Sequence, residues 1–532
     1  MRDFIAYAQF ETFWNRIQPQ TPFGRADHEA MTIHRSPADL EYIWDETEVA
    51  LRLLEELEGD PACLSRILHH LKRLPRFPQV AKERFDEVEF FQFKKFLYNY
   101  KSLVYLVNLE VRRTFGFRYE SEAFEQLLDT GRQSPESFFV SDSFSDALSE
   151  VRAEIQTVNE AIKALQLVRA EAIQKRWGLA FGDRAFLVVP RDLLGEFDEA
   201  GTLVMVEPFD ETKITLRPLP CTEELRLVER RSLLSSQERF CEDEVLTRLS
   251  FAANRELENL NAYQEALTRF DLALAGARLA REFHLVRPRL HAGPVEMKGG
   301  RFLPCEELCR DLGTAYAPLE ASFDCPATVI FGSNMGGKTV VLKTLAFLQL
   351  CTQAGLFVPA ESFSTRLFQH FHYLGEGCSQ SEGRGLSGFG FEIRRLVDAW
   401  ATLSEPALML FDEFARTTNS KEAEAILSAV VEALTQLPEV TALFSTHFHG
   451  VRRLSEARYL RMKGLDRQGL ALARDAEIPL DARIRLIDEH MAFHLVPDNE
   501  AMQSADAIAV AELLGLPSGI AERATHYFEQ AN

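Results

Sequence analysis

The glycine-rich loop Gly332–Thr339 constrains the fold of this chain more than any other feature of the sequence. It reads GSNMGGKT and fits the pattern G-x-x-x-x-G-K-[ST]. The apolar segment 327–331 precedes the loop, and a helical pattern over 337–355 follows it. A strand, a glycine-rich loop and a helix in this order bring backbone N–H groups and the positive end of a helix dipole to phosphate oxygens. The sequence therefore predicts an α/β domain with a nucleotide phosphate site at this loop.

Every residue of the loop is a candidate nucleotide contact. The glycines allow the backbone to close on phosphate. Lys338 is expected to reach the β- and γ-phosphates, and the Thr339 hydroxyl is expected to ligate Mg²⁺. The candidates are Gly332, Ser333, Asn334, Met335, Gly336, Gly337, Lys338 and Thr339. The expected cofactors are therefore ATP and Mg²⁺.

Two further apolar segments end in residues that suit hydrolysis. Leu408–Phe411 leads into Asp412 and Glu413, so a buried strand would deliver the Asp412 carboxylate to Mg²⁺ and place Glu413 to polarise water. The segment 441–447 ends in His447. This histidine either orients the attacking water or is an ordinary hydrogen-bonded core residue.

Changes in hydrophobic periodicity divide the chain into three expected parts. They are an N-terminal helical core over 1–130, an arm over 131–290 and the α/β domain over 291–532. In the arm, long amphipathic helical patterns over 143–176 and 222–283 flank a β insertion at about 185–220. We therefore expect a helical region with a small β-containing tip ahead of a mainly parallel sheet.

Composition narrows the class of protein. The formal net charge is −21, which disfavours a dedicated nucleic-acid binder but leaves a local basic patch open. The eight cysteines show no paired metal-binding spacing, which favours reduced thiols in a cytoplasmic protein. The N-terminus has no signal-peptide pattern and no apolar run is long enough for a membrane span, so we expect no membrane association.

Several segments together resemble the MutS family of ATPases. The loop GSNMGGKT is similar to that family's G-P-N-M-G-G-K-[ST], and 377–392 is similar to its signature segment, which ends in S-T-F-x-x-E. FDEFARTTN at 411–419 is similar to D-E-x-G-R-G-T, and FSTHFH at 444–449 is similar to A-T-H-[YF]-H. The segment 507–524 resembles the family's closing helices. The resemblance implies an ABC-like P-loop domain at the C-terminus, preceded by a helical lever and a clamp.

The resemblance also implies roles for individual residues and a homodimer with composite ATP sites. Ser387 would reach across the dimer interface to the partner's nucleotide, much as an arginine finger acts in trans. Phe302 would stack on adenine. The other implied roles are phosphate and Mg²⁺ binding by Asn334, Lys338 and Thr339, Mg²⁺ binding by Asp412, water activation by Glu413, and a place beside the γ-phosphate for His447.

Several positions depart from the family pattern. Ser333 stands where the family has proline, Gly388 where it has threonine, and Ala415 and Thr417 where it has glycines. We also expect this chain to lack the family's N-terminal mismatch-reading and connector domains. The segment 412–419 resembles D-E-x-A-R-T-T-N in MutS-like ATPases tied to lysine and ornithine aminomutases, which are thought to reactivate those cobalamin- and pyridoxal-phosphate-dependent enzymes.

Three functions remain open from the sequence. The first is an ATP-driven remodeller or reactivase of a protein partner, such as an aminomutase. The second is a DNA-structure-binding ATPase in mismatch repair or recombination. It is disfavoured because residues 183–222 carry more acidic than basic side chains, which repels phosphate. The third, a scaffold with an inactive site, is disfavoured because Lys338, Asp412 and Glu413 are all present.

Overall fold

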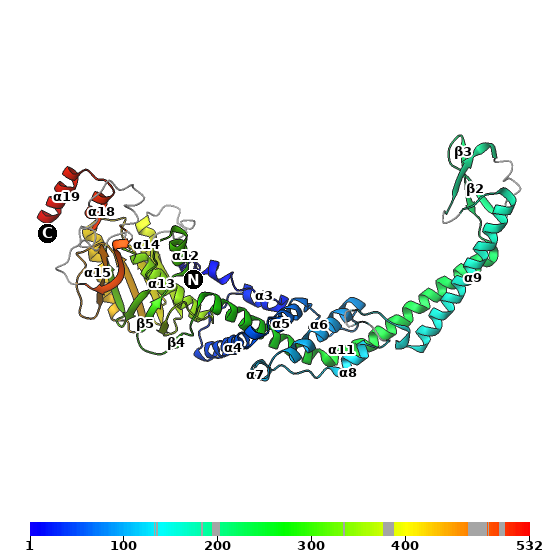
Figure 1. Ribbon diagram of the computed structural model, residues 1–532, viewed down its shortest axis with the longest axis horizontal. Coiled ribbons are helices and arrows are strands. Elements are labelled where there is room, and N and C mark those ends of the chain that lie inside the picture. Colours follow the sequence, from blue (N-terminus) through cyan, green and yellow to red (C-terminus); the bar gives the residue numbers. More distant parts are fainter. Residues whose placement is uncertain are drawn as a thin grey trace. The chain divides into compact units, whose positions relative to one another are not determined.

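A computed structural model describes residues 1–131, 134, 137–181, 185–193, 203–332, 336–375, 388–465, 487, 489–498 and 506–531 (Figure 1). The chain divides into two compact units. Unit 1 comprises residues 1–66, 108–116 and 267–532, and unit 2 comprises residues 67–107 and 117–266. This division differs from the expected boundaries at 130 and 290, because the first 66 residues share unit 1 with the α/β domain.

A six-stranded sheet forms the centre of unit 1, in the order β13-β12-β7-β11-β10-β9. All neighbouring strands pair in parallel except β12 and β13, which are antiparallel. Such strands are covered on both faces and therefore read as apolar runs, as the expected segments 327–331 and 408–411 do, and as 441–447 does at its centre, 442–444. The strands are β7 (Ala327–Phe331), β9 (His370–Gly375), β10 (Ala407–Asp412), β11 (Val440–Thr446), β12 (Arg458–Leu465) and β13 (Met491–Pro497).

Side chains alternate between two buried clusters, one on each face of this sheet. On one face, Leu408, Leu410 and Leu443 pack with α13. On the other face, Met409 and Phe444 pack with α15. The helices of the α/β domain are α12 (Leu303–Leu312), α13 (Lys338–Gln353), α14 (Gly388–Trp400), α15 (Ser420–Thr435), α18 (Asp506–Leu513) and α19 (Ser518–Ala531).

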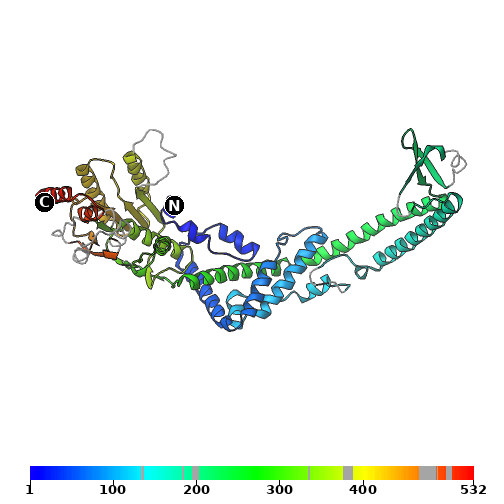
Figure 2. The same cartoon turned by 45° about the horizontal axis from the view of Figure 1, so that its top comes forward.

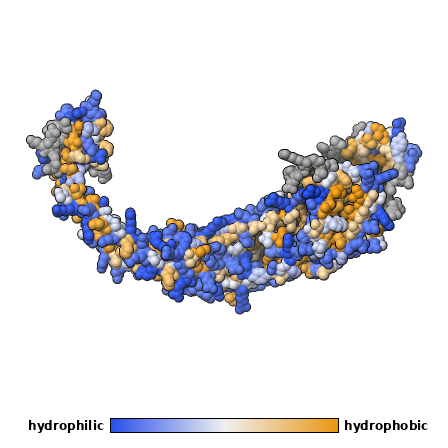
Figure 3. All heavy atoms as spheres, turned by 180° about the vertical axis from the view of Figure 1, so that it is seen from behind, coloured by the Kyte–Doolittle hydropathy of each residue, from blue (hydrophilic) through white to orange (hydrophobic). Residues whose placement is uncertain are grey.

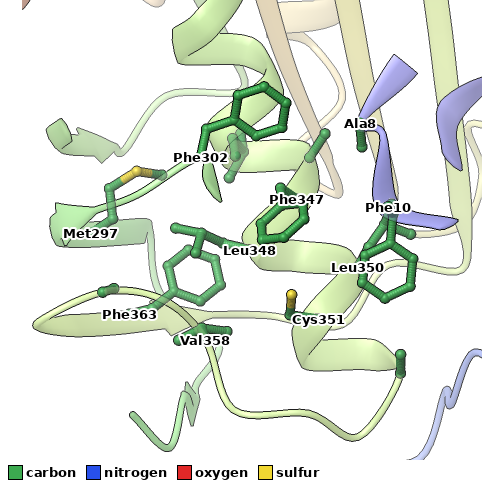
Figure 4. Packing of buried hydrophobic residues seen from close by; sticks show 14 of the residues in the cluster. Ala8, Phe10, Met297, Phe302, Phe347, Leu348, Leu350, Cys351, Val358 and Phe363 are labelled. Carbon is green, nitrogen blue, oxygen red and sulfur yellow. The ribbon is translucent and has the colours of Figure 1, made fainter. Parts of the chain in front are cut away.

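A second, four-stranded sheet in unit 1 has the order β4-β8-β5-β6. Its strands are β4 (Arg289–Leu290), β5 (Val295–Gly300), β6 (Leu319–Phe323) and β8 (Ser362–Thr365). Met297 and Phe363 from this sheet join the same cluster as Phe347, Leu348 and Leu350 of α13, as Figure 4 shows. The sheet therefore extends the core on the α13 side of the α/β domain.

The N-terminal segment of unit 1 is helical, as expected, but it belongs to the core of the α/β domain. Phe10 and Phe13 lie against Phe347 of α13, with ring centroids 6.0 and 5.1 Å apart. Asp271 accepts hydrogen bonds from the backbone N–H groups of Gln20 and Thr21, at 2.8 and 2.7 Å. The helices are α1 (Arg2–Tyr7), α2 (Phe10–Trp14), α3 (Pro22–Glu29), α4 (Pro37–Glu56), η1 (Leu57–Gly59) and α7 (Leu109–Phe115).

Unit 2 contains the two expected long helices, which run side by side in both views (Figures 1 and 2). They are α9 (Asp146–Trp177) and the 62-residue α11 (Thr222–Phe283), whose last residues belong to unit 1. Val158 and Ile162 pack on Leu234, and Arg152 pairs with Glu238 at 2.8 Å. The shorter elements are α5 (Pro61–Arg73), which begins in unit 1, α6 (Glu87–Leu106), α8 (Glu122–Leu128), η2 (Asp142–Phe144) and η3 (Arg191–Leu193).

The expected β insertion is a three-stranded antiparallel sheet, ordered β1-β3-β2. The strands are β1 (Leu187–Pro190), β2 (Val204–Pro208) and β3 (Lys213–Pro218). One face packs through Val189 and Leu216 on Ile173 of α9. In the space-filling view, hydrophobic residues gather on unit 1 and on the β tip of unit 2, whereas the long helices of unit 2 are mainly hydrophilic (Figure 3). Within the described parts of the chain, no helix combines the length and apolar character that crossing a bilayer requires.

Candidate nucleotide site

The glycine-rich loop connects the carboxyl end of β7 to the first turn of α13, which begins at Lys338. Gly337 precedes the helix with φ +85°, a conformation that side chains rarely adopt, and a Cβ there would lie 3.2 Å from the ring of Phe493. The predicted contacts Ser333, Asn334 and Met335 lie outside the described residues. The strand, loop and helix order that the motif requires is therefore present.

Lys338 is buried beside two acidic residues. Its side chain is 3% exposed, and its Nζ donates a hydrogen bond to the Gly332 carbonyl at 2.8 Å. The same Nζ lies 3.5 Å from Glu413 Oε1. Burial lowers the pKa of Lys338, while the Glu413 and Asp412 carboxylates oppose that change. The ammonium group is thus held at the mouth of the loop, where the motif predicts phosphate.

Asp412, the last residue of β10, receives hydrogen bonds from three hydroxyl groups. Its Oδ1 accepts from Thr339 Oγ1 at 3.0 Å and from Ser445 Oγ at 2.5 Å. Its Oδ2 accepts from the Tyr7 hydroxyl at 3.2 Å. Next to it on β9, a Cβ on Gly375 would come within 2.7 Å of the Asp412 carbonyl oxygen. The predicted metal ligands Thr339 and Asp412 are therefore adjacent.

Glu413 and His447 are also close together. Glu413 has φ +54°, which is uncommon for a residue with a side chain and indicates local backbone strain. Its Oε2 lies 3.3 Å from His447 Nδ1. Both atoms are buried, and among the described residues neither has a hydrogen-bond partner of suitable geometry. A water molecule or a phosphate oxygen would satisfy such groups.

Among the described residues, the signature segment contributes a contact to the loop that follows β10. Glu392 of α14 is buried, and its Oε2 accepts a hydrogen bond from the backbone N–H of Ala415 at 2.8 Å. Burial raises the pKa of Glu392, although this hydrogen bond acts in the opposite direction. Ala415 itself has φ +64°. The predicted trans-acting residue Ser387 lies outside the described residues.

The position of Phe302 does not fit its expected role. It is 3% exposed and packs edge-on against Phe347, with ring centroids 5.7 Å apart. Figure 4 shows the two rings as neighbours in the cluster. A ring enclosed by the core has no face available to stack on adenine. The resemblance identified an aromatic residue near the site, but the residue caps α12 and points into the cluster.

A small apolar cavity lies beside Gly337 instead. It measures about 100 Å³ and has more apolar than polar lining. Tyr316 and Phe493 provide aromatic walls, and Val340 and Thr344 of α13 contribute beside the loop. The remaining lining residues are Cys305, Cys309, Ala315, Ala317, Leu319, Val341 and Met462. A planar heterocycle attached to phosphates in the loop could enter this cavity.

Sequence reasoning missed two residues that contact Asp412. Ser445 lies in the segment 441–447, for which the sequence predicts a role only for His447. Tyr7 lies in an amphipathic stretch with Phe4 and Phe10, which indicates a buried helix but gives no sign of its partner. Its contact with Asp412 depends on tertiary packing across 405 positions of sequence.

Comparisons with known proteins agree with the geometry. The model of MutS domain V matches residues 328–532. The chain is 26% identical over 317 residues to the DNA mismatch repair protein MutS of Bacteroides thetaiotaomicron, covering 58% of this chain and 35% of the relative. It is 31% identical over 330 residues to Endonuclease MutS2 of Thermomicrobium roseum, with coverages of 58% and 40%. For Endonuclease MutS2 of Ruminiclostridium cellulolyticum, the identity is 25% over 432 residues, with coverages of 77% and 49%. The chain thus spans between a third and a half of the length of these relatives.

Proposed function

We propose that this chain, whose residues 328–532 match the model of MutS domain V, hydrolyses ATP with Mg²⁺ and uses the cycle to change the conformation of a protein partner. One observation carries the hydrolytic part of the proposal. The ends of β7 and β10 bring Lys338 within 3.5 Å of Glu413, and the Thr339 hydroxyl within 3.0 Å of Asp412. This is the set of groups that phosphoryl transfer to water requires.

The donor set fits Mg²⁺, which prefers oxygen ligands. Thr339 Oγ1 and Asp412 Oδ1 lie 3.0 Å apart at the start of α13 and would hold the ion. When bound there, Mg²⁺ supplies charge neutralisation on the β- and γ-phosphate oxygens. Lys338 and the backbone N–H groups at the start of α13 would bind the same phosphates.

Glu413 is the proposed residue that orients and deprotonates water. As the water oxygen bonds to the γ-phosphorus, the bond from that phosphorus to the β,γ-bridging oxygen breaks and ADP leaves. The water proton passes to the Glu413 carboxylate and then to solvent. His447, 3.3 Å from Glu413 Oε2, would hydrogen-bond the same water or the γ-phosphate. The adenine ring would occupy the cavity between Tyr316 and Phe493.

We propose that the active form is a homodimer with shared sites. Residues that follow the sheet, in α18 and α19, would provide dimer contacts, and Ser387 would complete the partner's nucleotide site. A hydroxyl supplied in trans makes hydrolysis depend on dimerisation, as an arginine finger does. Mixing Ser387→Ala chains with Lys338→Ala chains tests this arrangement, because only mixed dimers would retain one complete site.

The surface of the β tip favours a protein partner over DNA. Phe186, Val188 and Met205 are exposed there, at 45, 40 and 42%. The basic side chain of Arg217 is paired with Glu207 at 2.9 Å, which leaves its charge neutralised. Exposed apolar side chains beside a neutralised arginine suit a protein better than a phosphate backbone. An aminomutase whose activity the ATPase restores is the partner class that we favour.

A DNA-structure-binding ATPase is the second candidate, because the relatives include proteins named for DNA mismatch repair. ATPase assays with and without heteroduplex DNA at about 0.15 M salt, where exposed charges are screened, separate the two candidates. Strong stimulation by DNA would reject the protein-remodelling proposal. Stimulation by an aminomutase and not by DNA would support it, and Glu413→Gln should abolish the stimulated rate.

A further inference from the structure

The N-terminal helix α1 lies against the edge of the nucleotide site. Phe4 packs on Phe371 of β9, with ring centroids 5.1 Å apart. Asp3 forms an ion pair with Arg395 of α14. These contacts belong to unit 1 and fix α1 between β9, the edge strand of the sheet, and α14, whose first residues end the signature segment.

Tyr7, the last residue of α1, is directed at Asp412. Its ring stacks on Tyr373 with centroids 3.9 Å apart and planes inclined by 19°. The Lys343 ammonium lies 5.3 Å from the centre of the same ring. The Tyr7 hydroxyl lies 3.2 Å from Asp412 Oδ2 and 3.4 Å from the Thr339 carbonyl oxygen. Tyr7 is 9% exposed, so its hydroxyl is held in place by stacking and burial.

The two carboxylate oxygens of Asp412 are held from different directions. Oδ1 accepts hydrogen bonds from the Thr339 and Ser445 hydroxyls. Within the described part of the chain, Oδ2 accepts a hydrogen bond from the Tyr7 hydroxyl. A carboxylate held only at Oδ1 could rotate about its Cβ–Cγ bond. The bond from Tyr7 restricts that rotation and therefore fixes the direction of the lone pairs that would face a metal ion. Groups that orient a metal ligand in this way commonly change metal affinity when they are removed.

We propose that Tyr7 is a positioning residue for Asp412, and that α1 is thereby a working part of the ATPase site. This inference rests on the proposed function, since it assigns Asp412 to Mg²⁺. It implies that removing the hydroxyl weakens Mg²⁺ binding in the presence of nucleotide and leaves metal-free nucleotide binding intact. A purely structural tyrosine would change thermal stability and leave the Mg²⁺ requirement unchanged.

The test uses Tyr7→Phe, which keeps the ring that stacks on Tyr373 and deletes only the hydroxyl. The full chain is titrated with Mg²⁺ at a saturating concentration of a fluorescent ADP analogue, and the Mg²⁺ midpoint is read from the fluorescence. The matched control is Tyr119→Phe in unit 2. It removes the hydrogen bond of 2.8 Å that the Tyr119 hydroxyl donates to Glu125 Oε2. Thermal unfolding of each variant without ligand shows whether it is folded.

We expect the Mg²⁺ midpoint of Tyr7→Phe to rise about tenfold, with Tyr119→Phe at the wild-type value. Equal Mg²⁺ midpoints for Tyr7→Phe and the wild type, in folded proteins, would overturn the positioning role of Tyr7. They would leave the proposed ATPase function standing. A second variant, Tyr7→Leu, should raise the midpoint at least as far, because it also loses the ring that stacks on Tyr373. Absence of nucleotide binding by the wild type would overturn the proposed function together with this inference.

Discussion

Ser445 and Asp412 are joined by a 2.5 Å hydrogen bond between the carboxyl ends of two adjacent parallel strands. The same Ser445 hydroxyl oxygen lies 3.3 Å from the backbone N–H of Glu413, which donates to it. One buried side chain thus contacts both the candidate metal ligand and the backbone of the candidate base. The positions of these two acidic residues are therefore set by β11 as well as by their own strand.

Replacing Ser445 with alanine should weaken metal binding. The substitution removes one of two hydroxyl donors to Asp412 Oδ1, and a hydrogen bond to a charged group contributes about 1.5–3 kcal/mol. We expect the Mg²⁺ midpoint for nucleotide binding to rise about tenfold. Ser428→Ala on α15, whose hydroxyl bonds to the Glu424 carbonyl oxygen, is the control. An unchanged midpoint in folded Ser445→Ala would contradict the assignment.

Glu413→Gln should separate ATP binding from hydrolysis. Glutamine keeps the size of the side chain but removes the charge that accepts a proton, so the hydrolysis rate should fall at least about a hundredfold. Affinity for ATP should change much less, because we propose that Lys338 and the loop, and not Glu413, bind the phosphates. Single-turnover hydrolysis and nucleotide titration measure the two effects. The control is Glu432→Gln on α15, because the side chain of Glu432 is 56% exposed.

The motif-bearing strands could be predicted from the sequence because each motif combines an apolar run with a fixed polar end. Asp412 and Ser445 lie opposite each other in the strand register, so the ends of such strands gather polar groups at one edge. The neighbours of α1 could not be predicted in this way. Its apolar spacing requires a buried face, but any apolar surface of the fold would satisfy that requirement.

Phe302 illustrates the same limit at a single residue. A phenylalanine near a nucleotide loop is equally compatible with stacking on a base and with packing in a core. The choice depends on whether its ring faces Phe347 or the cavity beside Gly337, which is a matter of backbone direction at the start of α12. Local sequence does not specify that direction.

His372 on β9 should make unit 1 less stable in mild acid. Burial, followed by the influence of His370, lowers the pKa of His372 to about 4 from an ordinary value of 6.5. The unfolded chain therefore binds the proton more tightly, and stability present above pH 6.5 is lost as the pH falls toward 4. At pH 5 the loss from this group is about 2 kcal/mol.

Calorimetry at pH 5 and pH 7 checks this expectation with His372→Gln. Glutamine keeps a polar group near Thr402 Oγ1, which bonds to His372 Nε2 at 2.8 Å, but it does not titrate. The variant should lose less stability between pH 7 and pH 5 than the wild type. The same pH dependence in both proteins would show that His372 does not contribute.

Phe302 and Phe493 should respond differently to substitution, because only Phe493 lines the cavity beside Gly337. Phe302→Leu shortens a buried side chain and should cost about 1–2 kcal/mol of stability, with little change in affinity for ATP. Phe493→Ala should weaken ATP binding while triphosphate without a base binds as in the wild type. Thermal unfolding and competition between ATP and inorganic triphosphate distinguish the two effects. If Phe302→Leu instead selectively weakened ATP and left stability unchanged, the base would have to stack on Phe302 after all.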